Sequence, residues 1–363
     1  MAPSPSLFPF RFAAVGSGWR AEFFVRMARL LPDRFECVAV VSRDPERGAW
    51  VERQWGVPTV RAIADLPALS PEIVVVATPW SVTPEAITEL VGLGLPVLAE
   101  TPPAPDAPGL RALWQAVGSS GLVQVAEHSP SMPAHQARIA VVEAGVIGMP
   151  TSVQISSTHL YHAVGLIRRL LGAGCGAVEV RSSQFVAPLV DPMTRDGWNG
   201  RTESALRSTI LATLDFGDGK SALYDFTENQ WHNPLRTNRI VVRGSQGEIV
   251  DNAVTRWVDA QTVVTSSIER RQTGIEQQLD GWDTQHISLD GRVLWRNPFE
   301  GARLADDDVA VATLLERCAA WLRDQGPEPY PLADGLQDHL LGLAIEESAR
   351  TGSPVTAGPE AWA

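Results

Sequence analysis

Short apolar runs alternate with helix-like segments over the first third of the chain, and this alternation limits the fold more than any other feature. The runs at 11–16, 35–42, 72–79, 96–100 and 121–127 have the length and composition of strands. Strands that alternate with helices are typical of a parallel sheet with crossover connections. The 72–79 run, EIVVVATP, is rich in β-branched residues, as expected of a strand covered on both faces. The sequence therefore predicts a doubly wound α/β domain.

A glycine turn follows the first of these strands. The segment VGSGWRA has Gly16, Gly18 and Ala21 in the G-x-G-x-x-A spacing, between a strand and a helix. Gly16 permits the tight turn, Gly18 lets a pyrophosphate approach the backbone, and Ala21 keeps helix and strand close. The N-terminus of the helix then faces the anion. This context predicts a dinucleotide site, with Trp19 and Arg20 in the same turn.

The end of the second strand predicts which dinucleotide binds. NAD-selective proteins place an acidic side chain there, whereas this strand ends in Ser42-Arg43. A hydroxyl followed by a guanidinium suits a 2'-phosphate, and Arg47 is close enough in sequence to help. Asp44, followed by Pro45, is interpreted as a helix cap. We therefore favour NADP over NAD, although Arg43 is also compatible with a solvated surface role.

The pattern changes after residue 128. Helical segments at 134–145 and 159–172 flank a strand at 151–157, and mostly alternating strands then run to about residue 297. The segment 239–252 contains a Gly-Ser-Gln-Gly turn and predicts a hairpin. Two helices, 308–326 and 332–352, close the chain. We expect a Rossmann domain over 1–128 and an α+β domain over 129–363, with a large open, mostly antiparallel sheet and a last helix that packs back on the first domain.

Composition excludes several classes of function. The 363 residues are 44% hydrophobic with a formal net charge of -12, and no cluster of Lys and Arg suited to nucleic acid is apparent. No run approaches the length of a membrane span. Three widely spaced cysteines form neither a disulfide framework nor a CxxC site, which favours the cytoplasm. The seven histidines show no HExxH pattern, so no metal site is expected.

Several motifs together resemble the Gfo/Idh/MocA family, named for glucose-fructose oxidoreductase, inositol dehydrogenase and a rhizopine catabolism protein. The segments that carry the likeness are VGSGWRA, VVVATPWSVTPEAI, GLPVLAETP, VEAGVIGMPTSVQI and the terminal DGLQDHLLGLAIEESARTGSPV. The resemblance covers nearly the whole chain. It implies an NAD(P)-dependent oxidoreductase that acts on a sugar, polyol or related carbonyl compound, and a homo-oligomer, dimer or tetramer, formed through the open sheet.

The family pattern also implies an active site from which this chain departs. The family has Glu-Lys-Pro at the end of the fourth strand and Asp-x-x-x-His at a later helix start. Here the first motif is Glu100-Thr101-Pro102, and the second aligns Thr158 with the aspartate and His162 with the histidine. The family's Thr-Pro-Asn becomes Thr78-Pro79-Trp80, and the resemblance implies that these residues, with Glu100 and Thr101, contact the cofactor. The resemblance therefore implies His162 as acid/base, assisted by the neutral hydroxyls of Thr101 and Thr158.

Other side chains are candidates for substrate contacts or have structural alternatives. An imidazole needs no tuning to exchange protons near neutrality, but His162 also fits a structural role. Thr158 fits the cap of a helix that starts at His159. Indole rings suit sugar rings, although most tryptophans serve packing. The candidates for the substrate are His128, His159, Tyr161, Trp198 and Trp231.

Two alternatives to a dehydrogenase remain open, because fold does not fix function. The loss of two of the three family groups is compatible with a redox-silent regulatory protein that binds a dinucleotide. It is also compatible with a lyase or glycosidase that uses bound NAD without net redox change. In every case the partner is a small molecule, with no nucleic acid and no membrane.

Overall fold

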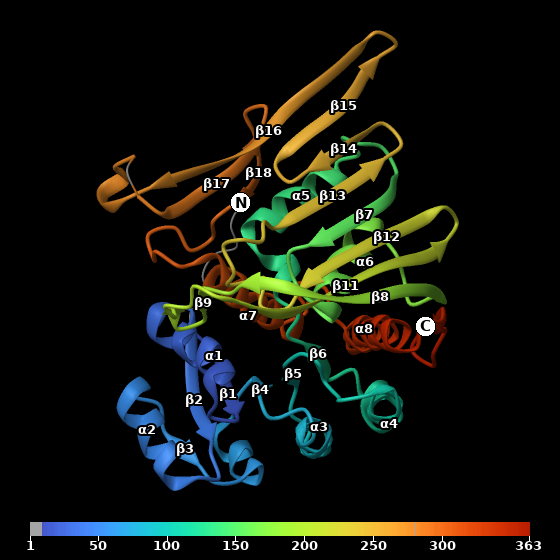
Figure 1. The fold of residues 1–363 in the computed structure, drawn as a ribbon. Coiled ribbons are helices and arrows are strands. Elements are labelled where there is room, and N and C mark those ends of the chain that lie inside the picture. The colour runs from blue at the N-terminus through green and yellow to red at the C-terminus, as the bar shows by residue number, and fades with distance from the viewer. Residues whose placement is uncertain (1–8, 280) are drawn as a thin grey trace.

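The computed structural model describes residues 9–279 and 281–363, and it divides into two sheets with helices between and around them (Figure 1). The first sheet has six parallel strands in the order β3-β2-β1-β4-β5-β6. The predicted Rossmann fold is thus confirmed. The sequence reading missed the two-residue strand β3, which pairs with the end of β2. The strands are β1 (Phe10–Val15), β2 (Phe35–Val41), β3 (Thr59–Val60), β4 (Ile73–Val76), β5 (Val97–Ala99) and β6 (Val123–Val125).

Helices cover both faces of this sheet, as the continuous apolar strands require. All four residues of β4 are buried, in agreement with its β-branched sequence. Asp44 caps the second helix by accepting hydrogen bonds from the amides of Glu46 and Arg47, which confirms the cap interpretation. The helices are α1 (Trp19–Leu30), α2 (Pro45–Trp55), α3 (Thr83–Gly92) and α4 (Ala107–Val117), with short 3-10 turns at 63–69, 118–120 and 129–131.

The second sheet has eleven strands in the order β18-β17-β16-β15-β14-β13-β7-β12-β11-β8-β19. Its pairs are antiparallel except for β12 and β7, and β13 with β14 forms the predicted hairpin. The strands are β7 (Pro150–Ser156), β8 (Val178–Val190), β11 (Ser204–Gly217), β12 (Lys220–Thr227), β13 (Arg239–Gly244), β14 (Gly247–Val250), β15 (Ala253–Asp259), β16 (Thr262–Thr273), β17 (Asp283–Leu289), β18 (Arg292–Arg296) and β19 (Val355–Ala357); β9 (Met193–Thr194) and β10 (Gly197–Trp198) form a separate small hairpin.

Helices cover one face of the large sheet and join it to the Rossmann domain. Contacts connect α6 with β7, and α8 with β8 and β19. The last two helices also reach the first domain, since α7 packs against α1, and α8 against α4 and β6. Figure 1 shows α7 and α8 between the two sheets. These helices are α5 (Pro133–Glu143), α6 (Leu160–Leu171), α7 (Asp306–Leu322) and α8 (Leu332–Thr351).

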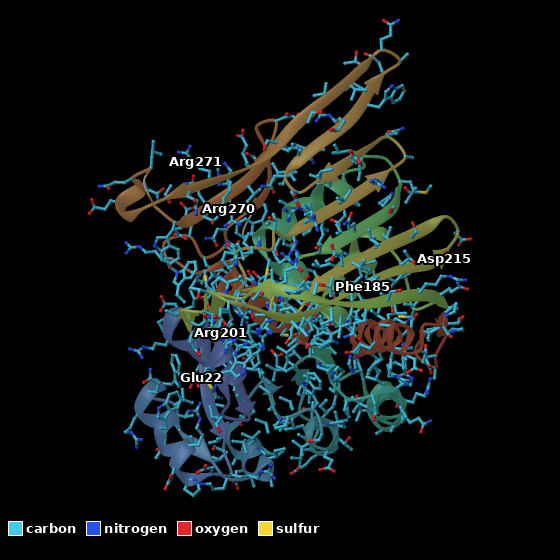
Figure 2. All side chains as sticks on the ribbon, in the orientation of Figure 1. Glu22, Phe185, Arg201, Asp215, Arg270 and Arg271 are labelled. Atoms are coloured by element: carbon cyan, nitrogen blue, oxygen red, sulfur yellow. The ribbon has the colours of Figure 1, made fainter. Side chains whose placement is uncertain are left out.

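Three consecutive aspartates at the start of α7 tie the parts of the molecule together. Asp306 accepts two hydrogen bonds from Arg270 of β16, which Figure 2 labels. Asp307 lies 3.4 Å from Nε2 of His128. Asp308 pairs with Arg26 of α1. Carboxylates in a first helical turn are also favoured by the helix dipole. The start of α7 therefore holds the large sheet, the segment after β6 and helix α1 in one arrangement.

Candidate functional site

The glycine turn has the geometry that a dinucleotide requires. Gly16 has φ +108°, and a Cβ at this position would lie 2.3 Å from the carbonyl oxygen of Ala77, so only glycine fits. Gly18 is the N-cap of α1, where no side chain caps the helix, and a Cβ there would meet nothing within 4 Å. The backbone amides of this helix end are therefore open to an anion. The residues present fit the pyrophosphate of a dinucleotide.

Serine and arginine side chains gather around the end of β2, where the ribose is expected. Ser42 is buried and its hydroxyl lies 3.1 Å from that of Ser17. Arg43 is exposed. Arg47 donates to the Ser17 carbonyl at 2.6 Å and to Glu22 at 2.6 Å, so its guanidinium braces the glycine turn. Arg61, which the sequence analysis did not single out, donates to the Ser42 carbonyl at 2.8 Å.

Two further cofactor candidates, Trp19 and Trp80, are each about half exposed. The tip of the β9–β10 hairpin reaches Trp19, with the guanidinium of Arg195 3.6 Å from the centre of its ring. The hairpin also holds Trp198, which is 74% exposed. Thr78 belongs to the same strand end as Pro79, and its hydroxyl contacts that of Thr83 at 2.8 Å.

The segment that follows β5 is buried in its first half. Its prolines would suit a stiff surface connection, but Pro102, Pro103 and Ala104 are buried, whereas Pro105 and Asp106 are exposed. The peptide bond between Thr101 and Pro102 is cis. Glu100 is 7% exposed, and one of its carboxylate oxygens accepts from Nε of Arg20 at 2.7 Å. The first half of this proline-rich segment therefore lies inside the molecule and its second half reaches the surface, where the Pro105 carbonyl lies 3.3 Å from Nε2 of His339 of α8.

Helix α6 brings two of the candidate histidines together at its start. His159 is the N-cap and the first helical residue is Leu160, so His159 and His162 lie side by side with ring centres 5.1 Å apart. The proposed cap role of Thr158 is wrong, since its hydroxyl accepts from Nε1 of Trp231 at 3.4 Å instead. Trp231 also packs edge-on against His159, at 4.6 Å between ring centres. Thr158, His159 and Trp231 thus form one wall beside His162.

His162 has a carboxylate partner that the sequence analysis did not name. Its Nδ1 lies 2.5 Å from Oε2 of Glu127, whose side chain is 2% exposed. The other oxygen, Oε1, accepts from the Ser129 amide at 2.9 Å. Burial by itself raises the pKa of the Glu127 carboxyl, but the charge and hydrogen bond of His162, with His128 and Ser129, outweigh burial and lower that pKa to about 2. Glu127 is therefore a buried carboxylate that is fully hydrogen-bonded.

A signal for Glu127 was present in the sequence. It follows the strand run GLVQVA, and the carboxyl ends of parallel strands are where ligand sites of such sheets lie. His128, the next residue, connects this edge to the glycine turn, because its Nδ1 lies 3.0 Å from an Arg20 nitrogen. An arginine can only donate, so Nδ1 accepts and the proton of neutral His128 is on Nε2, toward Asp307.

The remaining candidate, Tyr161, lies between these groups. Its ring is 4.5 Å from that of His162, and its hydroxyl is near Thr101. Burial raises its pKa well above the ordinary value, with the charges of Glu127 and Glu100 acting in the same sense. Tyr161 is therefore a neutral hydrogen-bonding group here. In the parts of the chain that the structure describes, no cluster of three His, Cys, Asp or Glu is placed to hold a metal, and no helix is long and apolar enough to cross a membrane.

Comparison with known proteins agrees with this geometry. Residues 10–128 match the Gfo/Idh/MocA model, described as an oxidoreductase family with an NAD-binding Rossmann fold. The oxidoreductase subunit assigned to UDP-kanosamine synthase in Amycolatopsis mediterranei is 32% identical over 114 residues. That match spans 31% of this chain and only 32% of the relative's length.

Solved structures share the whole fold at low identity. The myo-inositol dehydrogenase of Corynebacterium glutamicum is 18% identical with a TM-score of 0.66, over 97% of this chain and 100% of the other. The WlbA dehydrogenase of Bordetella pertussis, solved with NADH and UDP-GlcNAcA, is 16% identical with a TM-score of 0.63, over 98% and 99% of the two chains. The first domain of this chain, residues 10–128, therefore matches the NAD-binding Rossmann domain of the Gfo/Idh/MocA oxidoreductase family.

Proposed function

We propose that this protein transfers a hydride between a nicotinamide cofactor and a carbon that alternates between alcohol and carbonyl, in a sugar, polyol or related compound. The observation that carries the proposal is the position of His162. It stands at the start of α6, beside the segment after β6 and next to Tyr161, whose hydroxyl is near Thr101. An acid/base group and the strand ends of a dinucleotide-binding sheet therefore meet in one place.

The chain's own residues supply the proton chemistry. Because Nδ1 of His162 is turned to Glu127, Nε2 carries the lone pair of the neutral ring. In the oxidative direction Nε2 takes the hydroxyl proton while the carbon loses its hydride, and a carbonyl forms. In the reductive direction the imidazolium returns that proton to the carbonyl oxygen. When bound, the nicotinamide accepts or supplies the hydride.

Thr101 has a supporting role in this proposal. A hydroxyl can hydrogen-bond the reacting oxygen, but it lacks the charge of the family's lysine. The loss of one charged donor costs on the order of 10²-fold in rate. A slow dehydrogenase is therefore expected rather than an inactive one. Thr158, His159 and Trp231 form the wall against which we place the substrate ring, with His128 on the opposite side.

For the cofactor we propose NADP in preference to NAD. The carboxylate of Asp44 is occupied by the amides of α2, whereas Arg43 is exposed at the strand end where a 2'-phosphate lies in this fold. Arg47, already bound to Glu22, contributes only indirectly. Arg61 adds positive charge beside Ser42.

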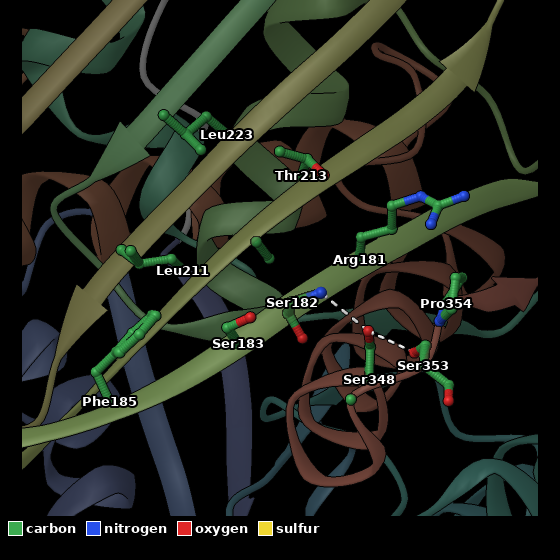
Figure 3. Close-up of a pocket in the computed structure, with 12 residues that line it drawn as sticks. Arg181, Ser182, Ser183, Phe185, Leu211, Thr213, Leu223, Ser348, Ser353 and Pro354 are labelled. Atoms are coloured by element: carbon green, nitrogen blue, oxygen red, sulfur yellow. Dashed lines mark hydrogen bonds between the residues drawn. The ribbon is translucent and has the colours of Figure 1, made fainter.

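We further propose that two or four copies associate through the open face of the large sheet, in the cytoplasm. Phe185 of β8, Leu211 of β11 and Leu223 of β12 are exposed together on that face, around a hollow that Figure 3 shows. Exposed apolar patches of this kind mark interfaces. The three cysteines are free thiols, which suits a reducing compartment. Light scattering would test the assembly, and Leu211→Glu should shift it to monomer.

The activity is tested by following reduced nicotinamide in absorbance with a panel of sugars, polyols, inositols and their keto forms, with either cofactor. We expect slow turnover that His162→Gln abolishes while cofactor affinity is retained. Tight cofactor binding with no redox change for any compound would instead favour the redox-silent regulatory protein. Substrate cleavage or elimination without net reduction of the cofactor would favour the lyase or glycosidase.

A further inference from the structure

We infer that Glu127 supplies, from the end of β6, the carboxylate that the family pattern places at position 158, and that it sets the orientation and tautomer of His162. This inference rests on the proposed function. Glu127 acts through His162 and is a positioning residue. The acid/base pair is thus retained, but one of its members is encoded 35 residues before the histidine instead of four.

Thr158 cannot fill this place. Its hydroxyl is bonded to the Trp231 indole, and a threonine does not ionise near neutral pH. Glu127 does have the required position and state. Its side chain is 2% exposed and both carboxylate oxygens have donors, one from His162 and one from the Ser129 amide. A buried carboxylate without partners would be costly, so this pair is held in one geometry.

The Ser129 amide determines which carboxylate oxygen of Glu127 faces His162. With Oε1 held by that amide, Oε2 remains for Nδ1 of His162, at 2.5 Å. The neutral imidazole then has its proton on Nδ1 and its lone pair on Nε2. The carboxylate also stabilises the imidazolium that forms when Nε2 takes a proton. Asp–His pairs in hydrolases use the same principle to fix the tautomer of a catalytic histidine.

The charged and titratable groups around His162 come from several elements. On α6 itself these are His159 and Tyr161, and the segment after β6 adds His128 next to Glu127. Farther out lie Arg20 of α1 and Asp307 of α7, both bound to His128, and Tyr330 with Asp338 of α8 near Glu127. Among the carboxylates that the structure describes, Glu127 alone contacts the His162 ring directly.

The decisive variants are Glu127→Gln, which keeps the size and removes the charge, and Glu127→Asp, which keeps the charge. The matched control is Glu143→Gln, because Glu143 also pairs with α6, through Arg169, but is exposed. Two readouts are needed: the pH profile of kcat in the oxidative direction, and NMR titration of the labelled His162 ring, assigned with His162→Gln.

We expect Glu127→Gln to lower kcat on the order of 10²-fold at neutral pH, with cofactor affinity changed less than about 2-fold. The acidic limb of the kcat profile and the NMR midpoint of His162 should both move to lower pH. In Glu127→Asp the acidic limb and the NMR midpoint should both lie closer to their wild-type values. Glu143→Gln should match the wild type in both measurements. A Glu127→Gln protein with an unchanged profile and midpoint would overturn the inference.

The NMR arm separates this inference from the proposed function. If the wild type turns over no compound, the proposed function fails, and the titration alone then decides. A lower His162 midpoint in Glu127→Gln would still support control of the imidazole by Glu127, and an unchanged one would overturn it. If Glu127→Gln does not fold, the same comparison is made with Glu127→Asp, whose shorter side chain should shift the midpoint in the same direction by less.

Discussion

Nε of Arg20 donates to Oε1 of Glu100 at 2.7 Å, and this ion pair joins the glycine turn to the strand end that precedes Thr101. The side chains are only 20% and 9% exposed. Arg20 also holds His128, so one guanidinium connects the cofactor end of the site to the acid/base end. Arg20 therefore ties the glycine turn to the residues beside Thr101 and Glu127.

Removal of Arg20 should destabilise the fold. Arg20→Gln leaves the Glu100 carboxylate buried without its ion partner, so we expect the free energy of unfolding to fall by about 3 kcal/mol. Urea denaturation measures this. The control is Arg350→Gln, whose pair with Glu347 is exposed and should contribute little to stability. Equal effects of the two variants would contradict the role of the buried pair.

Substitution of the two glycines of the turn should have different effects: Gly16→Ala on stability and Gly18→Ala on cofactor binding. Gly16→Ala places a Cβ 2.3 Å from the Ala77 carbonyl at φ +108°, so it should lower stability by at least about 2 kcal/mol. Gly18→Ala meets nothing within 4 Å and should fold normally, but its methyl group enters the space of the pyrophosphate. We expect a loss of cofactor affinity of at least about 10-fold for Gly18→Ala. Thermal unfolding and cofactor titration together distinguish the two effects.

Arg43 should decide cofactor choice. If NADP binds as proposed, Arg43→Ala removes a charge-assisted hydrogen bond worth about 1.5–3 kcal/mol, so NADP affinity should fall roughly 10- to 100-fold while NAD affinity stays within about 2-fold. Isothermal titration with both cofactors provides the measurement. Arg53→Ala, at the far end of α2, is the control and should leave both cofactor affinities unchanged. Tighter binding of NAD than of NADP by the wild type would refute the proposed preference for NADP.

The Thr101 hydroxyl should matter for the rate alone. Thr101→Val keeps the shape of the side chain and removes the hydrogen-bond donor, and we expect kcat to fall about 10- to 100-fold. Thr101→Ser should retain most of the activity. Cofactor affinity is expected to be the same in both variants, and steady-state kinetics with separate cofactor titration checks this. Equal activity of the Val and Ser variants would exclude the hydroxyl from the reaction.

Stability should decline in mild acid, in part through His159. Its buried Nδ1 has no partner among the described residues, and burial lowers the pKa of this histidine from 6.5 to about 3. Between these values the unfolded chain binds the proton and the folded chain does not. The part of the free energy of unfolding that depends on neutral His159 is therefore fully present above pH 6.5, and it is lost as the pH falls toward 3.

A comparison of the wild type with His159→Phe isolates this effect. Since His159 is only half-buried overall, we expect about 1 kcal/mol of the loss between pH 7 and 5 to disappear in the variant. Glu127, whose pKa is about 2, remains ionised over this range and does not interfere. Denaturant unfolding at several pH values gives the free energy of unfolding as a function of pH for both proteins. The same pH dependence in the wild type and in His159→Phe would contradict the role of His159.

Local patterns were sufficient to predict much of the fold. The strand, glycine turn and helix at 10–30 form a contiguous unit, and the cap at Asp44 and the hairpin at 239–250 likewise depend on neighbouring residues. His162 was found because its distance in sequence from residues 166–172, at the end of the same helix, matches the family pattern. Such features can be read from the chain because the residues that specify them lie within a few positions of one another.

The sequence by itself determined the parallel sheet, the glycine turn and the histidine at the start of α6. Only the tertiary structure decided which groups meet there: Glu127 with His162, Arg20 with Glu100 and His128, and Arg195 with Trp19. It also showed that Thr158 does not cap α6 and that Pro102 and Pro103 are buried. The reason is physical, since segments 35 to 176 residues apart meet only when both sheets and the helices between them have packed.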